Sequence, residues 1–124
     1  MEIAKLKKII EKTLNKNKAK NIVSLNLKGK TSIADYMVVA SGTSSKHIQA
    51  LSEILLKELE NNGFDKCKIE GRTSNDWKLI DAIDIIVHIF HPDKRKFYDL
   101  EKMWSQTITK DRISIWRKYL FFYF

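Results

Sequence analysis

The 124-residue sequence lacks the features of disulfide-rich, membrane-spanning and disordered proteins. Its single cysteine, Cys67, has no second thiol to pair with, which excludes a disulfide-stapled secreted domain and fits a reducing compartment. One proline and four glycines, beside 44% hydrophobic and 31% charged residues, exclude collagen-like and low-complexity chains. No stretch approaches the roughly 20 apolar residues of a membrane span, and residues 1–20 contain no apolar signal-peptide core. We therefore expect one compact cytoplasmic domain.

The net charge of +8 is concentrated at the two ends of the chain. Residues 1–30 hold nine lysines and two acidic residues, and residues 105–124 hold four basic residues and one acidic residue. The stretch 31–104 has ten basic and twelve acidic residues, a net charge of −2. An RNA would attract the basic ends through counterion release, but a solvated lysine face on the first helix explains them equally well.

Apolar spacing predicts alternating helices and strands. Helices are expected at 2–16 and from about 48 to 59, the second one preceded by capping hydroxyls at 41–45 and ended by Gly63. Strands are expected at 23–27, 36–40, 66–70, 77–81 and 84–90, with 36–40 buried in the centre. A last helix is expected to begin at Pro92. This order predicts the α/β class, a small mixed β-sheet of about five strands packed with helices.

Several side chains invite enzymatic or metal-binding interpretations, and each has a simpler explanation. His88 lies in an apolar run and His91 beside a proline, and no cluster of cysteines or carboxylates completes a tetrahedral set, so no metal is expected. Asp81 and Asp84 resemble a magnesium-binding pair, but a spacing of three along a strand points them to opposite faces. The loop 41–45 lacks the lysine of a P-loop, and helix capping explains its hydroxyls. We expect no catalysis and no cofactor.

A binding surface explains more of the sequence. Trp77, Leu79 and Asp81 alternate onto one face of the strand 77–81. If exposed, this tryptophan and leucine beside carboxylates would form an anchor with a charged rim, the arrangement in which few residues carry most of the binding energy. On the residues alone, packing of Trp77 into the core is an equal alternative.

Six segments in the same order carry a resemblance to a known family. They are SIADY at 32–36, ASGTS at 40–44, Glu70-Gly71, Trp77, DIIVHIF at 84–90 and YDLEKMW at 98–104. Over residues 6–104 the chain resembles the ribosomal silencing factor family, also called the Iojap family. Each segment alone is a weak signal, but six at family-like spacing form a specific one.

The resemblance implies a nucleotidyltransferase-like topology without catalysis. It implies binding to large-subunit ribosomal protein number fourteen, which keeps the two subunits apart and represses translation when nutrients are short. It favours an interface role for Trp77, and the implied partner-binding residues are Glu70, Asp76, Trp77, Leu79, Asp81, Asp84 and Tyr98. A net charge of −2 in the centre suits a basic partner, and the basic ends would tolerate or contact ribosomal RNA. A nucleotidyltransferase-like enzyme and an RNA-binding large-subunit assembly factor stay open as alternatives.

Two departures from the family pattern stand out. Many members have a glycine before the aspartate of the last strand, where this chain has Ile83. The family usually ends near Trp104, so we expect a silencing-factor domain at 1–104 and a basic, aromatic extension at 105–124. Six of the nine residues 116–124 are aromatic, and solvated monomers seldom expose such a patch. Burial in a homodimer is expected first, docking on the chain's own sheet second and a membrane contact last.

Overall fold

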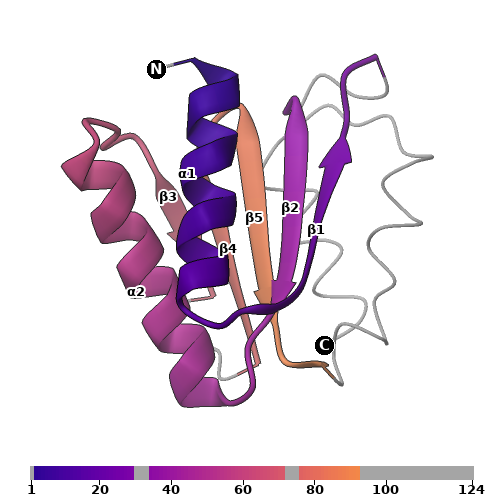
Figure 1. Ribbon diagram of the computed structural model, residues 1–124, viewed down its shortest axis with the longest axis vertical. Coiled ribbons are helices and arrows are strands. Elements are labelled where there is room, and N and C mark those ends of the chain that lie inside the picture. Colours follow the sequence, from indigo (N-terminus) through magenta and orange to yellow (C-terminus); the bar gives the residue numbers. More distant parts are fainter. Residues whose placement is uncertain (1, 30–33, 72–75, 93–124) are drawn as a thin grey trace.

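The computed structural model describes residues 2–29, 34–71 and 76–92 of the chain (Figure 1). The elements are α1 (Ile3–Lys16), β1 (Lys20–Asn26), β2 (Tyr36–Ser41), α2 (Ser45–Asn61), β3 (Lys68–Glu70), β4 (Trp77–Asp81) and β5 (Ile85–Phe90). These seven elements confirm the predicted order, with ends that differ by a few residues. The helix expected after Pro92, Tyr98 and the extension 105–124 lie outside the described residues.

The five strands form one mixed sheet in the order β1-β2-β5-β4-β3. β2 and β5 are parallel, whereas the β1–β2, β4–β5 and β3–β4 pairs are antiparallel. Both helices lie on the same face of the sheet, with β1 and β3 at its two edges (Figure 1). The predicted α/β class with a five-stranded mixed sheet is therefore confirmed, and β2 is an inner strand as expected.

Apolar side chains fill both faces of the inner strands because successive residues point to opposite sides. The helix-covered face includes Val38 and Ala40 of β2 and Val87 and Ile89 of β5, packed against α1 and α2. The second face carries a separate cluster. Its buried members are Leu27, Ala34, Met37, Val39, Trp77, Leu79, Ile86 and Phe90. Burial on both faces explains why the segments 36–41 and 85–90 are almost wholly apolar.

Local sequence signals position the two helices. Leu6, Ile10 and Leu14 of α1 recur at helical spacing and are buried beneath the helix. Gly63 follows the end of α2 with φ +86°, a left-handed conformation that glycine adopts without steric cost. The glycine predicted to end this helix therefore does so for a conformational reason.

The turn between β4 and β5 forces an isoleucine into a left-handed backbone conformation. Ile83 has φ +68°, and the Asp84 N–H donates across it to the Ala82 carbonyl (2.9 Å). The Ala82 N–H in turn donates to the Ile85 carbonyl (2.9 Å), so the hairpin loop is very short. At positive φ the Cβ atom conflicts with the backbone, most severely in a β-branched residue. Ile83 therefore occupies a position where glycine has a physical advantage.

We expect Ile83→Gly to stabilise the protein. Relief of the left-handed strain should stabilise the folded protein by about 1 to 2 kcal/mol. The greater freedom of glycine in the unfolded chain should offset about 0.5 to 1 kcal/mol of this gain. The net gain of about 1 kcal/mol should raise the melting temperature by about 4 °C or more. Ile54→Gly is the matched control, because Ile54 is similarly exposed (39% against 42%) but lies inside α2, where glycine should destabilise. A lower melting temperature for both variants would contradict strain at Ile83.

Candidate partner-binding surface

Trp77 lies on the second face of the sheet, at the start of β4. Only 8% of its surface is exposed, and Leu79 is fully buried. Both belong to the second cluster, and Trp77 pairs in register with Phe90 of β5. The predicted exposed anchor of Trp77 and Leu79 is therefore wrong, and the alternative in which Trp77 packs into the core is correct. β4 lies between β3 and β5, and all five of its residues are buried, so alternation could not reveal an exposed face.

Gly71 leaves room for the indole ring of Trp77. A Cβ atom at position 71 would lie 2.5 Å from Cε3 and Cζ3 of Trp77, closer than real Cβ contacts occur, and Gly71 also has φ +80°. From β4, the buried Lys78 ammonium donates a hydrogen bond to the Gly71 carbonyl oxygen (2.6 Å). Burial lowers the pKa of Lys78 from its ordinary value. Gly71, Trp77 and Lys78 thus hold the ends of β3 and β4 together, a role for Lys78 that sequence reasoning missed.

Asp81 stabilises the β4–β5 turn. It is 4% exposed, and its Oδ1 atom accepts a hydrogen bond from the Ile83 N–H (2.9 Å). Asp84 lies beyond the turn, before β5, and its side chain is exposed. The prediction that Asp81 and Asp84 occupy opposite faces of one strand is wrong, because a hairpin turn separates them. Asp81 is held inside by its turn, which leaves Asp84 as the accessible carboxylate of the two.

The remaining predicted acidic residues lie at the other end of the sheet. Glu70 ends β3 and Asp76 precedes β4, and both are half-buried near Trp77. Since a strand rises about 3.3 Å per residue, the length of β4 separates this end from Asp84 by about 13 Å. Tyr98 lies outside the described residues. The single rim expected from the sequence is therefore divided between two ends of the sheet.

Charges of both signs meet at the end that carries Asp84. The Asp84 carbonyl accepts hydrogen bonds from the backbone N–H groups of Asp35 (2.8 Å) and Tyr36 (3.2 Å). The Tyr36 ring has the ammonium groups of Lys7 and Lys28 at 5.2 and 5.4 Å from its centroid, within cation–π range. This end of the sheet therefore presents carboxylates next to an aromatic ring flanked by lysines.

His88 and Cys67 take part in packing. His88 is fully buried, and its ring stacks on Phe90 with centroids 5.3 Å apart. Burial lowers the pKa of His88 to about 3, so the ring is neutral at pH 7. Burial likewise raises the pKa of Cys67 to about 11, which disfavours the nucleophilic thiolate. Among the described residues, no group of three or more potential ligands is placed to hold a metal ion.

The loop before α2 caps that helix, as its hydroxyls predicted. The Ser44 hydroxyl accepts a hydrogen bond from the His47 backbone N–H (3.1 Å). The His47 ring accepts from the Thr43 N–H at Nδ1 (2.9 Å), and its Nε2 lies 2.9 Å from the Asn17 carbonyl oxygen, in the position of a donor. His47 thereby joins the α1–β1 connection to the start of α2. Its spacing in the sequence carried no signal of this role.

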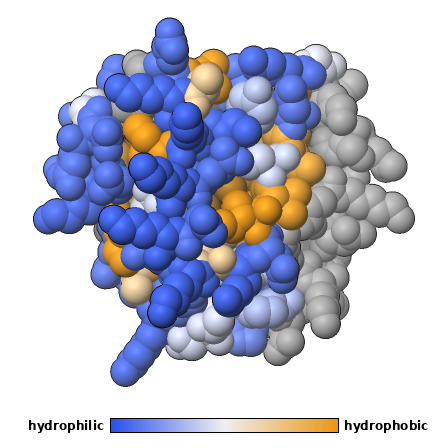
Figure 2. Space-filling view, viewed as in Figure 1, coloured by the Kyte–Doolittle hydropathy of each residue, from blue (hydrophilic) through white to orange (hydrophobic). Residues whose placement is uncertain are grey.

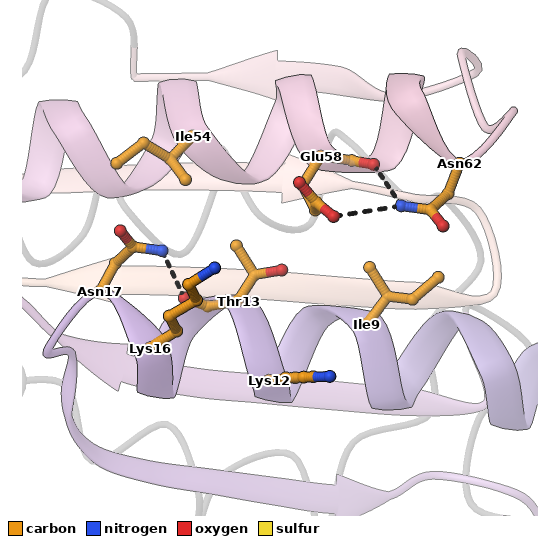
Figure 3. A pocket seen from close by; sticks show the side chains of 8 residues that line it. All are labelled: Ile9, Lys12, Thr13, Lys16, Asn17, Ile54, Glu58 and Asn62. Carbon is orange, nitrogen blue, oxygen red and sulfur yellow. Dashed lines mark hydrogen bonds between the residues drawn. The ribbon is translucent and has the colours of Figure 1, made fainter.

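A cleft of about 410 Å³ runs between α1 and α2 (Figure 3). It is lined by Ile9, Lys12, Thr13, Lys16, Asn17, Ile54, Glu58 and Asn62. The Asn17 amide donates to the Thr13 carbonyl (2.8 Å), and the Asn62 amide donates to the Glu58 carbonyl (2.8 Å). Its charged lining residues are two lysines and one glutamate.

The fold defines a small α/β protein with two helices on one face of a five-stranded mixed sheet. The helix-covered side is largely hydrophilic with scattered apolar areas (Figure 2). In the described segments, neither helix has the length and apolar character needed to cross a bilayer.

Comparisons with known proteins agree with this class. Residues 1–118 match the family model described as "Ribosomal silencing factor during starvation". The ribosomal silencing factor of Zymomonas mobilis is 44% identical over 100 residues, covering 81% of this chain and 75% of that protein. A crystal structure of a Chromobacterium violaceum protein superposes with a TM-score of 0.81 at 33% identity, covering 91% of this chain and 94% of the other. The mouse protein named "Mitochondrial assembly of ribosomal large subunit protein 1" is 30% identical over 104 residues, covering 82% of this chain and 46% of its own length. The chain belongs to the ribosomal silencing factor family.

Proposed function

We propose that this protein binds the large ribosomal subunit and prevents its joining to the small subunit, without catalysing a reaction. The family match over residues 1–118 carries the proposal. The described segments support a binding role, since burial keeps His88 neutral and disfavours the thiolate of Cys67. A protein bound at the joining face represses translation by occupying space, so its effect depends on affinity and position alone.

The proposed contact is large-subunit ribosomal protein number fourteen, a basic partner. Burial divides the implied interface residues into two groups. Those available for direct contact are Glu70, Asp76 and Asp84, whereas Trp77, Leu79 and Asp81 support the surface from beneath. Tyr98, the remaining implied residue, lies outside the described residues. The exposed carboxylate of Asp84 has the correct sign for a basic partner, so we assign it a direct electrostatic contact.

A second candidate function is a role in assembly of the large subunit. The name of the mouse relative supports it. Both functions require binding to the large subunit in the cytoplasm, where we place this protein. They differ in the particle bound, because a silencing factor acts on mature subunits whereas an assembly factor prefers precursors.

We expect saturating protein to co-sediment with purified large subunits and to reduce the yield of joined ribosomes in a sucrose gradient. Asp84→Lys should weaken this effect, since it places a like charge against a basic partner. Glu60→Lys is the matched control, because Glu60 is equally charged and exposed but lies on α2, on the helix-covered face. An unchanged yield of joined ribosomes with the native protein would refute occlusion. Binding to precursor particles alone would favour the assembly role.

A further inference from the structure

One face of α1 carries a row of lysines whose side chains form no hydrogen bond or ion pair with the described residues. At 100° per residue, four lysines fall within an arc of about 80° on the helix surface. This lysine stripe consists of Lys5, Lys8, Lys12 and Lys16, and all four side chains are exposed. It lies opposite the buried positions of the same helix, on the hydrophilic side of the molecule (Figure 2).

Within the described residues none of the four stripe lysines forms an ion pair, although the Glu58 carboxylate lines the cleft beside Lys12 and Lys16. Inside α1 the one acidic side chain is Glu11, which lies to the side of the stripe. Its Oε1 pairs with the Lys7 ammonium (3.4 Å) and its Oε2 accepts a hydrogen bond from the Ser24 hydroxyl (2.6 Å). Both oxygens of Glu11 are therefore engaged elsewhere, toward Lys7 and β1.

The like charges of the lysine stripe repel one another, and a bound anion would relieve this repulsion. Lys8, Lys12 and Lys16 are successive i, i+4 neighbours, and each like-charge pair at this spacing opposes helix formation by about 0.2 to 0.5 kcal/mol. Along α1 the four lysines span about 16 Å, with Lys18 and Lys20 exposed just beyond the helix. A linear array of cations on a rigid element is the pattern that a phosphate backbone neutralises, with release of its counterions.

We propose that the lysine stripe binds the phosphate backbone of a structured RNA. An RNA explains the pattern better than a lipid surface, because Leu6, Ile10 and Leu14 are buried under the helix and the partly buried Ile3 and Ile9 pack against the core, so no fully exposed large apolar side chain of α1 is free to enter a bilayer. The helix cleft alongside is lined by two stripe lysines, Lys12 and Lys16, and by the Glu58 carboxylate, which can accept a hydrogen bond from a sugar hydroxyl (Figure 3). That this RNA belongs to the large ribosomal subunit rests on the proposed function, whereas RNA binding itself does not.

The test measures binding of the full chain to a fluorescently labelled RNA hairpin by anisotropy, between about 50 and 200 mM salt. The stripe variant K5Q/K8Q/K12Q/K16Q should lose at least about tenfold in affinity near 100 mM salt, and the slope of log affinity against log salt should fall by about 3. Replacement of the same four residues by arginine should preserve binding, because the charges remain. Thermal unfolding of both variants checks that the helix is intact.

The control K46Q/K57Q/K66Q/K68Q removes the same total charge from exposed positions away from the stripe. It should lose less than about threefold in affinity. Equal losses in the two glutamine variants would mean that net charge alone attracts RNA, and this would overturn the proposal. Absence of RNA binding by the native protein, or stripe-dependent binding to phosphatidylserine vesicles instead, would also overturn it.

The same variants separate this inference from the proposed function. The stripe variant should still bind the isolated ribosomal protein, because that contact is assigned to the carboxylates. If the native protein fails to prevent subunit joining but binds RNA through the stripe, the proposed function fails and the RNA site stands. The native protein could instead prevent subunit joining while the stripe variant prevents it equally well at every salt concentration. If the stripe variant also keeps its RNA affinity, the RNA site fails and the proposed function stands.

Discussion

Trp77→Ala is expected to lower the free energy of unfolding by about 3 kcal/mol, because it removes a large buried side chain and leaves a cavity. Trp77 is 8% exposed within the second cluster, against Gly71 and Phe90. The melting temperature should fall by more than about 10 °C in thermal unfolding. Trp77→Phe keeps an aromatic ring, so its melting temperature should fall much less.

Gly71→Ala provides an independent test of the same packing. Its new methyl group would meet the indole at 2.5 Å and would force an alanine to φ +80°. This variant should therefore destabilise the protein although Trp77 is unchanged. Binding of Trp77→Ala to the large subunit is measured next to binding of Asp84→Lys. Asp84→Lys should lose affinity for the large subunit while its melting temperature stays unchanged. A Trp77→Ala variant that melts normally but loses partner affinity would contradict a core role and restore the exposed anchor.

Acidification from about pH 7.5 to pH 5 is expected to reduce the free energy of unfolding by about 2 kcal/mol through His88 alone. Burial lowers the pKa of His88 from 6.5 to about 3, so the unfolded chain takes up a proton that the folded chain excludes. Stability is therefore complete above about pH 6.5 and is lost as the pH falls toward 3, by about 1.4 kcal/mol per pH unit. The melting temperature should fall by about 10 °C over this range.

His88→Leu removes the titrating group while keeping an apolar side chain of similar size next to Phe90. This variant should show a flatter dependence of stability on pH between 7.5 and 5, whatever its stability at pH 7.5. His91→Gln is the control, because His91 is half-buried at the end of β5 and its backbone N–H bonds to the Asp76 carbonyl. It should keep the acid sensitivity of the native protein. The same acid loss in native protein and His88→Leu would show that His88 is not the responsible group.

The sequence alone predicted the element order and the cap of α2, because these depend on neighbouring residues. The spacing of Leu6, Ile10 and Leu14 indicates a helix without knowledge of what covers it. The β-branched run 85–90 likewise indicates a strand buried on both faces. The family could also be inferred from the sequence, since six short segments keep their order and spacing. Membership in the ribosomal silencing factor family confirms that resemblance.

The sites were less predictable because they depend on strand order and on exposure. Alternation placed Trp77 and Leu79 on one face of β4, but only the neighbours β3 and β5 and the second cluster decided that this face is buried. The short hairpin decided that Asp81 points into its own turn while Asp84 is exposed, and it revealed the left-handed φ of Ile83. Local periodicity reports which residues share a face. Whether that face contacts solvent is a property of the assembled sheet, so only the tertiary structure could determine it.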